Sequence, residues 1–367
     1  MDPKILIVCK EGFRPQYTGG GSYLSHVYSI IPYQDYFRVP ESSASGFKQH
    51  VLTPVSFVLE RRLIRRFFEG KAPPDFVHNN NVFSVPAFPK VLMVTSIHHL
   101  YSYMSQGTKG LLGTLKYFPQ EWAMLRNSDF VITGSVFTKG RIIRFFRFPE
   151  DRIVVIPYGV DTTLFFNRGL SEKPFIVLPN ALRYPLRKGG YFVLPALLEL
   201  LRLHPDLECL ITGQLSSEGE AILKALPSNV RYLGFVKEQE LSMLYGQALF
   251  VLFPSLYEGY GLVPLEVIAS GGVPVSSDVG AVSTYLKDRE NGLLLPLDQE
   301  KWREELKSLY ADKQLRESIR QENRDPKIRT WIDCAEDHKR FFEKIVKRNI
   351  HINNDVAKPT DHTLYEK

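Results

Sequence analysis

Short runs of β-branched and apolar residues alternate with amphipathic segments of helix length along the whole of this chain. This rhythm is typical of strands and helices that follow one another in turn, and it predicts an α/β fold in which helices flank parallel sheets. The predicted strands of the first half are 4–9, 76–79, 91–96, 130–133 and 153–156. Those of the second half are 175–178, 208–212, 230–233, 248–253, 273–276 and 292–295.

The rhythm is interrupted between residues 160 and 173, where a polar run bounded by prolines and glycine predicts a linker. A chain of 367 residues can form two domains of ordinary size, each with its own core. We expect the C-terminal helix to pack back on the N-terminal domain. The predicted parts are an N-terminal domain at 1–165, a C-terminal domain at 166–328, a helix at 329–349 and a polar tail at 350–367.

Composition excludes several classes of protein. A hydrophobic content of 44% argues against a disordered or fibrous chain. Cys9, Cys209 and Cys334 lie far apart and match no disulfide or metal-ligand spacing, which favours a reducing compartment. The first apolar run is too short for a signal peptide, and no run reaches the roughly 18 residues that span a bilayer. We therefore expect a cytoplasmic protein.

The net charge of +6 favours anionic partners. Arginines gather at 61–66 and at 141–147, the second group interleaved with phenylalanines. One interpretation is peripheral contact with the anionic inner face of a membrane. The other is a pair of solvated helix faces whose aromatic residues lie in the core. Nucleic acid is not an expected partner, because no recognisable nucleic-acid module accompanies the charge.

Residues 253–268 read FPSLYEGYGLVPLEVI and change from a buried strand to a helix. Gly259 and Gly261 interrupt the run, so we expect Glu258 on the loop and Glu266 at the opening of the helix. Unpaired N–H groups at such a helix start suit a diphosphate. Glu266 could accept hydrogen bonds from ribose hydroxyls and Glu258 from sugar hydroxyls. The alternative is that Glu266 only complements the helix dipole and Glu258 is solvated.

A second polar motif, NALRYPLRKGG, follows the first predicted strand of the second half. Arg183 and Lys188 flank Pro185 on this short loop. Both cations could reach one diphosphate, because a guanidinium binds oxygens bidentately and an ammonium adds a compact charge. For an isolated pair, an exposed basic turn is the alternative.

YEGYGLVPLE, together with the R-x-x-x-x-K-G pattern of RYPLRKG, resembles the retaining glycosyltransferases of family 4. The similarity continues in the expected order through SDFVITGSVFTK, VVIPYGVDTTLF, NVRYLGFV and the terminal RTWIDCAEDHKRFF. It is more specific in the second half of the chain than in the first. The resemblance implies the GT-B fold, in which two Rossmann-like domains with parallel sheets face each other across a cleft.

The resemblance also implies roles for the two motifs. Arg183 and Lys188 would grip the diphosphate of a nucleotide-sugar donor. Glu266 would hold the ribose, and Glu258 would face the transferred sugar. The other residues expected to contact the donor are Gly20, Gly21, Gly259, Tyr260, Gly261, Leu262 and Val236.

Two features of the first half match the same family. Residues 19–21 of YTGGGSYL resemble its glycine-rich loop that closes over donor and acceptor; Leu24 replaces the third glycine of G-x-G-x-x-G, which disfavours dinucleotide binding. His98 follows a predicted strand and matches the family's catalytic histidine, while a structural histidine is the alternative. His99 stands where relatives often carry an acidic or amide residue.

The sequence has no D-x-D pair, H-E-x-x-H helix or cysteine cluster, so we expect no metal or other cofactor. The resemblance implies transfer of a hexose-type sugar to a hydroxyl of a glycan or lipid-linked acceptor, with retention of configuration, in cell-envelope glycan assembly. Two alternatives stay open. One is a nucleotide-sugar hydrolase or phosphorylase on the same fold. The other is a non-catalytic protein that binds membrane surfaces.

Overall fold

The computed structural model describes residues 4–9, 19–38, 62–67, 69–70, 74–80 and 91–356. Contacts divide the chain into two compact units. The first comprises Met1–Ser96, Trp122–Ile132 and Ile332–Lys367, and the second comprises Ile97–Glu121 and Thr133–Trp331.

The first sheet has six strands in the order β2-β1-β3-β4-β5-β6. Its strands are β1 (Ile5–Cys9), β2 (Asp35–Arg38), β3 (Phe76–Asn80), β4 (Leu92–Ile97), β5 (Phe130–Thr133) and β6 (Ile153–Val155). β1 pairs in parallel with β2 and β3, and β3 with β4, placing Leu6 beside Val77 and Val77 beside Met93. These three side chains form a buried cluster with Val8 and Ile64.

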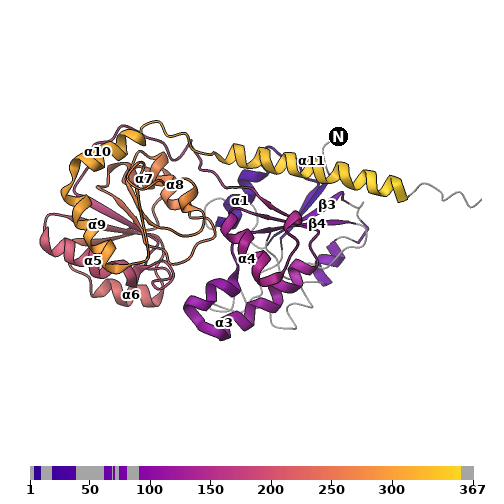
Figure 1. The fold of residues 1–367 in the computed structure, drawn as a ribbon, viewed down its shortest axis with the longest axis horizontal. Helices are drawn as coiled ribbons and strands as arrows, with labels where there is room; N and C mark the ends of the chain where they lie inside the picture. The colour runs from indigo at the N-terminus through magenta and orange to yellow at the C-terminus, as the bar shows by residue number, and fades with distance from the viewer. Residues whose placement is uncertain are drawn as a thin grey trace, which may run out of the picture. The chain divides into compact units, whose positions relative to one another are not determined.

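The helices that accompany this sheet are α1 (Gly19–Val27), α3 (Tyr101–Arg126), α4 (Val136–Phe146), a 3-10 turn (Glu150–Arg152) and α11 (Trp331–Val356). Helix α11 packs within the first unit (Figure 1). Its His338 lies 2.6 Å from the Tyr23 hydroxyl, and the Phe342 ring lies 4.8 Å from the Phe76 ring. Because α11 ends at Val356, the first residues of the expected polar tail are helical.

Helix α3 folds back on itself. The Tyr101 N–H donates to Glu121 Oε1 at 2.5 Å, and Thr114 Oγ1 donates to the Ser102 carbonyl at 3.2 Å. A straight helix rises about 1.5 Å per residue and would hold Tyr101 and Glu121 about 30 Å apart. The chain therefore reverses between Ser102 and Thr114. The buried Glu121 carboxylate thus holds the N–H groups that start α3, directly after the predicted site residue His98.

The second sheet also has six parallel strands, in the order β12-β11-β10-β7-β8-β9. Its strands are β7 (Phe175–Pro179), β8 (Glu208–Thr212), β9 (Val230–Gly234), β10 (Val251–Phe253), β11 (Pro274–Ser277) and β12 (Leu293–Leu295). Its helices are α5 (Gly190–Leu203), α6 (Ser217–Lys224), α7 (Glu238–Gln247), α8 (Leu262–Ala269), α9 (Gln299–Ala311) and α10 (Lys313–Glu322), with a 3-10 turn at Val282–Thr284. The core lies between this sheet and α5 and α9, around Trp302 and Phe250.

The predicted α/β class is confirmed, and every predicted strand is present. The sequence analysis missed β2, whose DYFR sequence carries charge at both ends and lies at the sheet edge. One expectation was wrong in detail. The glycines at 19–21 are the first residues of α1 rather than a loop, because the helix begins at Gly19.

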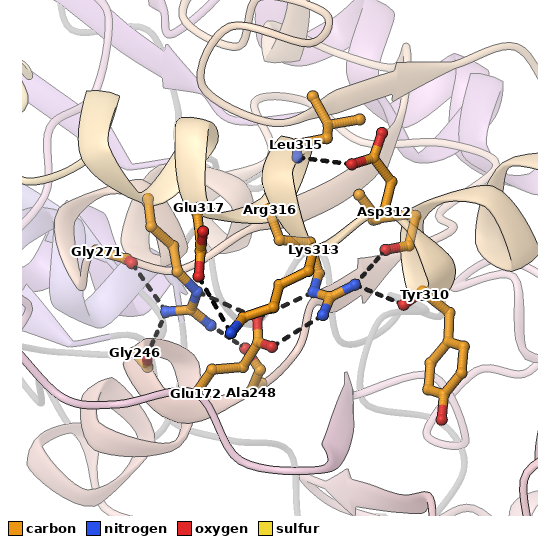
Figure 2. Close-up of polar contacts among 12 residues, drawn as sticks. Glu172, Gly246, Ala248, Gly271, Tyr310, Asp312, Lys313, Leu315, Arg316 and Glu317 are labelled. Carbon is orange, nitrogen blue, oxygen red and sulfur yellow. Dashed lines mark hydrogen bonds and ion pairs between the residues drawn. The ribbon is translucent and has the colours of Figure 1, made fainter.

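A partly buried ion pair joins helices of the second unit to the segment before β7 (Figure 2). Glu172 binds Arg316 of α10 through both carboxylate oxygens, each at 3.0 Å. The same guanidinium donates to the carbonyls of Leu309 and Tyr310 at the end of α9, both at 2.6 Å. Arg320 donates to the Gly246 carbonyl in α7 at 2.7 Å. The ends of two helices, α9 and α7, and the segment before β7 are therefore joined to α10 by two arginines.

We predict that Arg316→Ala lowers the free energy of unfolding by about 3–5 kcal/mol, because it leaves the Glu172 carboxylate without its bidentate partner. The residue is only 5% exposed, so solvent cannot replace the guanidinium. Urea unfolding measures the change. Lys313→Ala is the matched control in the same helix: its pair with Glu317 is exposed (side chains 72% and 61%), and its loss should cost less than about 1 kcal/mol. Equal losses in the two variants would contradict the prediction.

Candidate functional site

The predicted cation loop lies between β7 and α5. Asn180 starts the turn with a φ of 57°, and its N–H donates to the Thr212 carbonyl of the neighbouring strand at 2.8 Å. The Lys188 N–H closes the loop on the Tyr184 carbonyl at 2.8 Å. These bonds hold the loop at the carboxyl ends of the strands, where open parallel sheets bind ligands.

This loop docks directly on the chain that follows β10. Gly189 has a φ of 74°, and a Cβ at this position would overlap the Pro254 carbonyl. The Leu256 N–H donates to the Arg187 carbonyl at 2.9 Å. Only glycine permits this approach, and the approach brings Lys188 to the turn that carries Glu258.

Glu258 is the centre of a tight ionic cluster. Its Oε1 atom lies 2.5 Å from Lys188 Nζ and 3.7 Å from an Arg187 nitrogen, and it accepts a hydrogen bond from Ser255 Oγ at 2.8 Å. The side chains of Glu258 and Lys188 are 14% and 19% exposed. Burial alone would raise the pKa of Glu258, but Lys188 and Arg187 hold it below its ordinary value. The carboxylate is therefore ionised.

Positive charge is in excess around this carboxylate. Burial lowers the pKa of Lys188, and the negative charge of Glu258 opposes this shift. The positive charges of Arg187 and Arg183 lower the pKa of Lys188 further. Arg183 is thus close enough to Lys188 for their charges to repel. Its guanidinium lies 5.4 Å from the Tyr184 ring centroid. A second anion brought to the cluster would relieve the repulsion among the three cations.

The start of α8 adds backbone donors. Gly261 is the N-cap residue with a φ of 94°, and as a glycine it has no side chain with which to cap the helix. A helix end of this kind presents N–H groups and a partial positive charge. Glu266 is the fifth residue of α8, one turn inside the helix rather than at its opening as expected. Burial raises the pKa of Glu266 to about 7, with Glu238 adding to the effect and Lys188 opposing it.

The glycine turn between Glu258 and α8 also packs against the end of β4. A Cβ on Gly259 would overlap the His98 carbonyl, and the Gly259 carbonyl accepts a hydrogen bond from Ser135 Oγ at 2.7 Å. His98 Nδ1 lies 2.5 Å from the Tyr158 hydroxyl. The structure therefore brings His98 together with the turn that carries Glu258, although the two are far apart in the sequence.

The other predicted donor contacts are distributed along the chain. Tyr260 is buried, and its hydroxyl donates to the Tyr158 carbonyl at 2.9 Å. Leu262 is the first residue of α8, and Val236 is half-buried between β9 and α7. Gly20 and Gly21 lie in α1 of the first unit, whereas the cluster around Glu258 belongs to the second unit.

Sequence reasoning missed three members of this site: Arg187, Ser255 and Tyr158. Arg187 carries a signal, because it precedes Lys188 directly in LRKGG. Tyr158 lies just before the predicted linker, between β6 and residue 160, where the sequence indicated only the end of the N-terminal domain. Among the described residues, no group of three or more His, Cys, Asp or Glu side chains could hold a metal ion. No described helix is long and apolar enough to cross a membrane.

Comparison with known families agrees with this geometry. The Glycosyltransferase Family 4 model matches residues 18–164, and the model for Glycosyl transferases group 1 matches residues 161–325. The chain belongs to the group 1 glycosyltransferases of family 4 type. Both sequence motifs that carried the resemblance, and the whole cluster around Glu258, fall in the segment that the group 1 model matches.

Curated relatives of this glycosyltransferase match over part of their length. The O-antigen chain mannosyltransferase B of Escherichia coli is 27% identical over 45% of this chain and 47% of that protein. A glycogen synthase of Mycobacterium tuberculosis is 27% identical over 60% and 56%. A D-inositol 3-phosphate glycosyltransferase of Paenarthrobacter aurescens is 32% identical over 46% of each. The chain thus spans about half the length of these relatives.

Solved structures match over nearly the whole chain. A sucrose-phosphate synthase of Thermosynechococcus elongatus has a TM-score of 0.75 at 17% identity, covering 94% of this chain and all (100%) of that one. WaaG, a glycosyltransferase involved in lipopolysaccharide biosynthesis, has a TM-score of 0.68 at 17% identity, covering 92% and 99%. At such low identity the likeness shows the fold alone, which is the predicted GT-B class.

We predict that Glu266 makes the stability of this glycosyltransferase fall as pH rises. A carboxyl whose pKa is raised in the folded state binds more protons there than in the unfolded chain. The stability that this raised pKa contributes is fully present below pH 4.5, the ordinary pKa of a glutamate, and is lost as the pH rises through about 7. Glu266→Gln should therefore gain stability relative to the parent protein as the pH is raised from about 5 to about 8. Thermal unfolding across this range measures the gain.

Glu240→Gln is the control, because Glu240 is an exposed carboxylate on the neighbouring helix α7. Glu266→Gln should gain more stability than Glu240→Gln over the same pH range. If the difference in stability between Glu266→Gln and the parent protein does not change with pH, burial does not perturb the Glu266 carboxyl.

Proposed function

We propose that this protein transfers a hexose-type sugar from a nucleoside diphosphate sugar to a hydroxyl of a glycan or lipid-linked acceptor, with retention of configuration and without a metal. The observation that carries the proposal is the buried pair of Lys188 and Glu258 beside the start of α8, where the N-cap residue is a glycine. Arg183 and Arg187 add positive charge to the same place. An excess of cations beside helix N–H groups is suited to an anion with two phosphates.

Binding of a diphosphate changes the pairing in the cluster. Phosphate oxygens compete with Glu258 for Lys188, whose Nζ lies 2.5 Å from the carboxylate. Once Lys188 turns to the diphosphate, Glu258 can accept hydrogen bonds from hydroxyls of the sugar. Glu266, close to the start of the same helix, can accept them from the ribose. Glu258 is thus the anion that pairs with Lys188 and Arg187 until the donor binds.

Departure of the diphosphate breaks the bond between the anomeric carbon and the phosphate oxygen. The electron pair leaves with the oxygen, and the negative charge that develops is stabilised by Arg183, Lys188 and the first N–H groups of α8. Positive charge develops on the sugar, and the ionised Glu258 is suited to stabilise it. These fixed groups supply the electrostatic role that a metal ion plays in other phosphate-transfer sites.

Retention follows from front-face attack in this proposal. Glu258 is held by Lys188, Arg187 and Ser255 on one oxygen, which does not favour it as a covalent nucleophile. The acceptor hydroxyl attacks from the side the diphosphate leaves, and its proton passes to a leaving phosphate oxygen. If water or inorganic phosphate replaces the sugar acceptor, the same site acts as a hydrolase or phosphorylase.

Names of relatives support the substrate classes. HepE of Anabaena was solved with UDP and glucose, and a starch synthase of Arabidopsis thaliana with ADP and acarbose. The O-antigen and lipopolysaccharide enzymes favour a cell-envelope glycan or glycolipid as the acceptor here.

We place the reaction in the cytoplasm, at the inner face of the membrane. Helix α4 supports peripheral contact through its basic residues, although Arg141 is partly engaged with the Tyr103 ring at 4.2 Å.

We predict that Arg183→Ala and Lys188→Ala each weaken nucleoside diphosphate binding by about 10–100-fold, the range for a lost hydrogen bond to a charged group. Turnover should fall by about 10²–10³-fold with the fold intact. Calorimetric titration with UDP, GDP and ADP measures binding and selects the base. Lys224→Ala, an exposed cation at the end of α6, is the matched control and should bind like the parent protein. If no nucleotide binds the parent protein while anionic vesicles do, a non-catalytic membrane-binding protein replaces the proposed enzyme.

We also predict that the product keeps the anomeric configuration of the donor, and that EDTA leaves the rate unchanged. Proton NMR of the first product formed identifies the anomer before it equilibrates. An inverted product would remove the retaining assignment, and a glycosyl adduct trapped on Glu258 would replace front-face attack by a covalent intermediate. Release of free sugar at the same rate with and without acceptor would identify a hydrolase.

A further inference from the structure

Tyr158 occupies a fixed position beside His98. Its side chain is 7% exposed, and its ring is packed between the rings of Trp331 and Tyr260, with centroids at 5.6 and 4.8 Å. A Cβ on Gly134 would lie 2.8 Å from this ring, so the ring uses the space that glycine leaves. The phenol hydroxyl is therefore positioned by packing on three sides.

The backbone around Tyr158 is fixed as well. The Pro157 carbonyl accepts from Arg329 Nε at 2.9 Å, and the Val160 N–H donates to the Arg329 carbonyl at 3.0 Å. Gly159 lies so close to Thr330 that a Cβ would overlap its backbone. Residues 157–160 and 329–331 are thus joined as a small parallel bridge. A hydroxyl held this firmly can impose an orientation on the group it binds.

The group it binds is the His98 imidazole, through Nδ1 at 2.5 Å. Of the two possible directions, a phenol O–H is a stronger acid than a neutral imidazole N–H, and an imidazole nitrogen is a better acceptor than a phenol oxygen. The hydrogen bond therefore runs from Tyr158 to Nδ1. A hydrogen bond accepted by one ring nitrogen places the proton of the neutral ring on the other.

We infer that Tyr158 is a positioning residue that holds His98 as the neutral tautomer with its proton on Nε2, so that His98 acts on the bound donor as a hydrogen-bond donor and not as a base. The role toward substrate rests on the proposed function; the tautomer does not. His98 lies against Gly259, next to the carboxylate of Glu258. Its Nε2–H donates to an oxygen of the nucleotide sugar, and the acceptor's proton still goes to the leaving phosphate.

The tautomer is measured on the free protein by NMR with ¹⁵N-labelled histidine. The chain has nine histidines, and the signals lost in His98→Gln identify those of His98. We expect Nδ1 to show the shift of an unprotonated nitrogen and Nε2 that of a protonated one. In Tyr158→Phe, which keeps the ring packing, both signals should move toward averaged values. A proton on Nδ1 in the parent protein, or an unchanged spectrum in Tyr158→Phe, overturns the inference.

Activity separates this role from a structural one. Gln carries an N–H₂ group near the position of Nε2 and Glu carries only acceptors, so His98→Gln should keep at least about tenfold more kcat than His98→Glu. Tyr158→Phe should lower kcat by about tenfold, the factor for one hydrogen bond, with nucleoside diphosphate affinity unchanged. Tyr310→Phe removes a phenol hydroxyl from α9 of the same unit and should change neither value.

The outcomes distinguish the inference from the proposed function. Equal activity of His98→Gln and His98→Glu overturns the donor role of His98, even if both bind UDP normally. Failure of any nucleoside diphosphate to bind the parent protein overturns the proposed function, while the NMR result still decides the tautomer. Should Tyr158→Phe unfold, the spectrum of the parent protein alone decides it.

Discussion

The candidate site depends on two places where backbone lies against backbone. Gly189 touches the Pro254 carbonyl and Gly259 touches the His98 carbonyl, and a Cβ at either glycine would overlap its neighbour. The first contact joins the cation loop to the chain after β10, and the second joins the Glu258 turn to the end of β4. Side chains that are far apart in the sequence meet because glycine allows the main chain to approach so closely.

Close approach of the backbone explains the electrostatics of the site. Lys188 and Glu258 are buried together, so their attraction is strong and each is costly to leave alone. Arg187 and Arg183 add positive charge that Glu258 alone does not balance, and Glu266 is half neutral near pH 7 because its pKa is about 7. The three cations therefore repel one another, and a diphosphate bound beside them would relieve that repulsion. A structural ion pair would not need the extra cations.

Periodicity was sufficient to predict the α/β fold, and the two motifs identified Lys188 and Glu258 as one site before their contact was known. It could not locate β2, because a short edge strand with charged ends lacks the apolar pattern that marks the other strands. It also gave no partner for His98. That partner, Tyr158, follows β6 near the end of the predicted N-terminal domain, and pairing across 60 residues leaves no periodic trace in a single sequence.

The segment that follows β6, residues 157–160, therefore positions a side chain of the site. Residues 157–160 must leave β6, pair with 329–331 and place one phenol hydroxyl on His98, and the glycines near Tyr158 reflect these demands. Gly134 gives room to the Tyr158 ring, and Gly159 gives room to Thr330. A Cβ at Gly134 would lie 2.8 Å from the Tyr158 ring, and a Cβ at Gly159 would overlap the Thr330 backbone, so a larger residue at either place would disturb the packing that holds the Tyr158 hydroxyl. Glycines beside an aromatic residue outside helices and strands can therefore indicate a positioned side chain, where loop flexibility would be the usual interpretation.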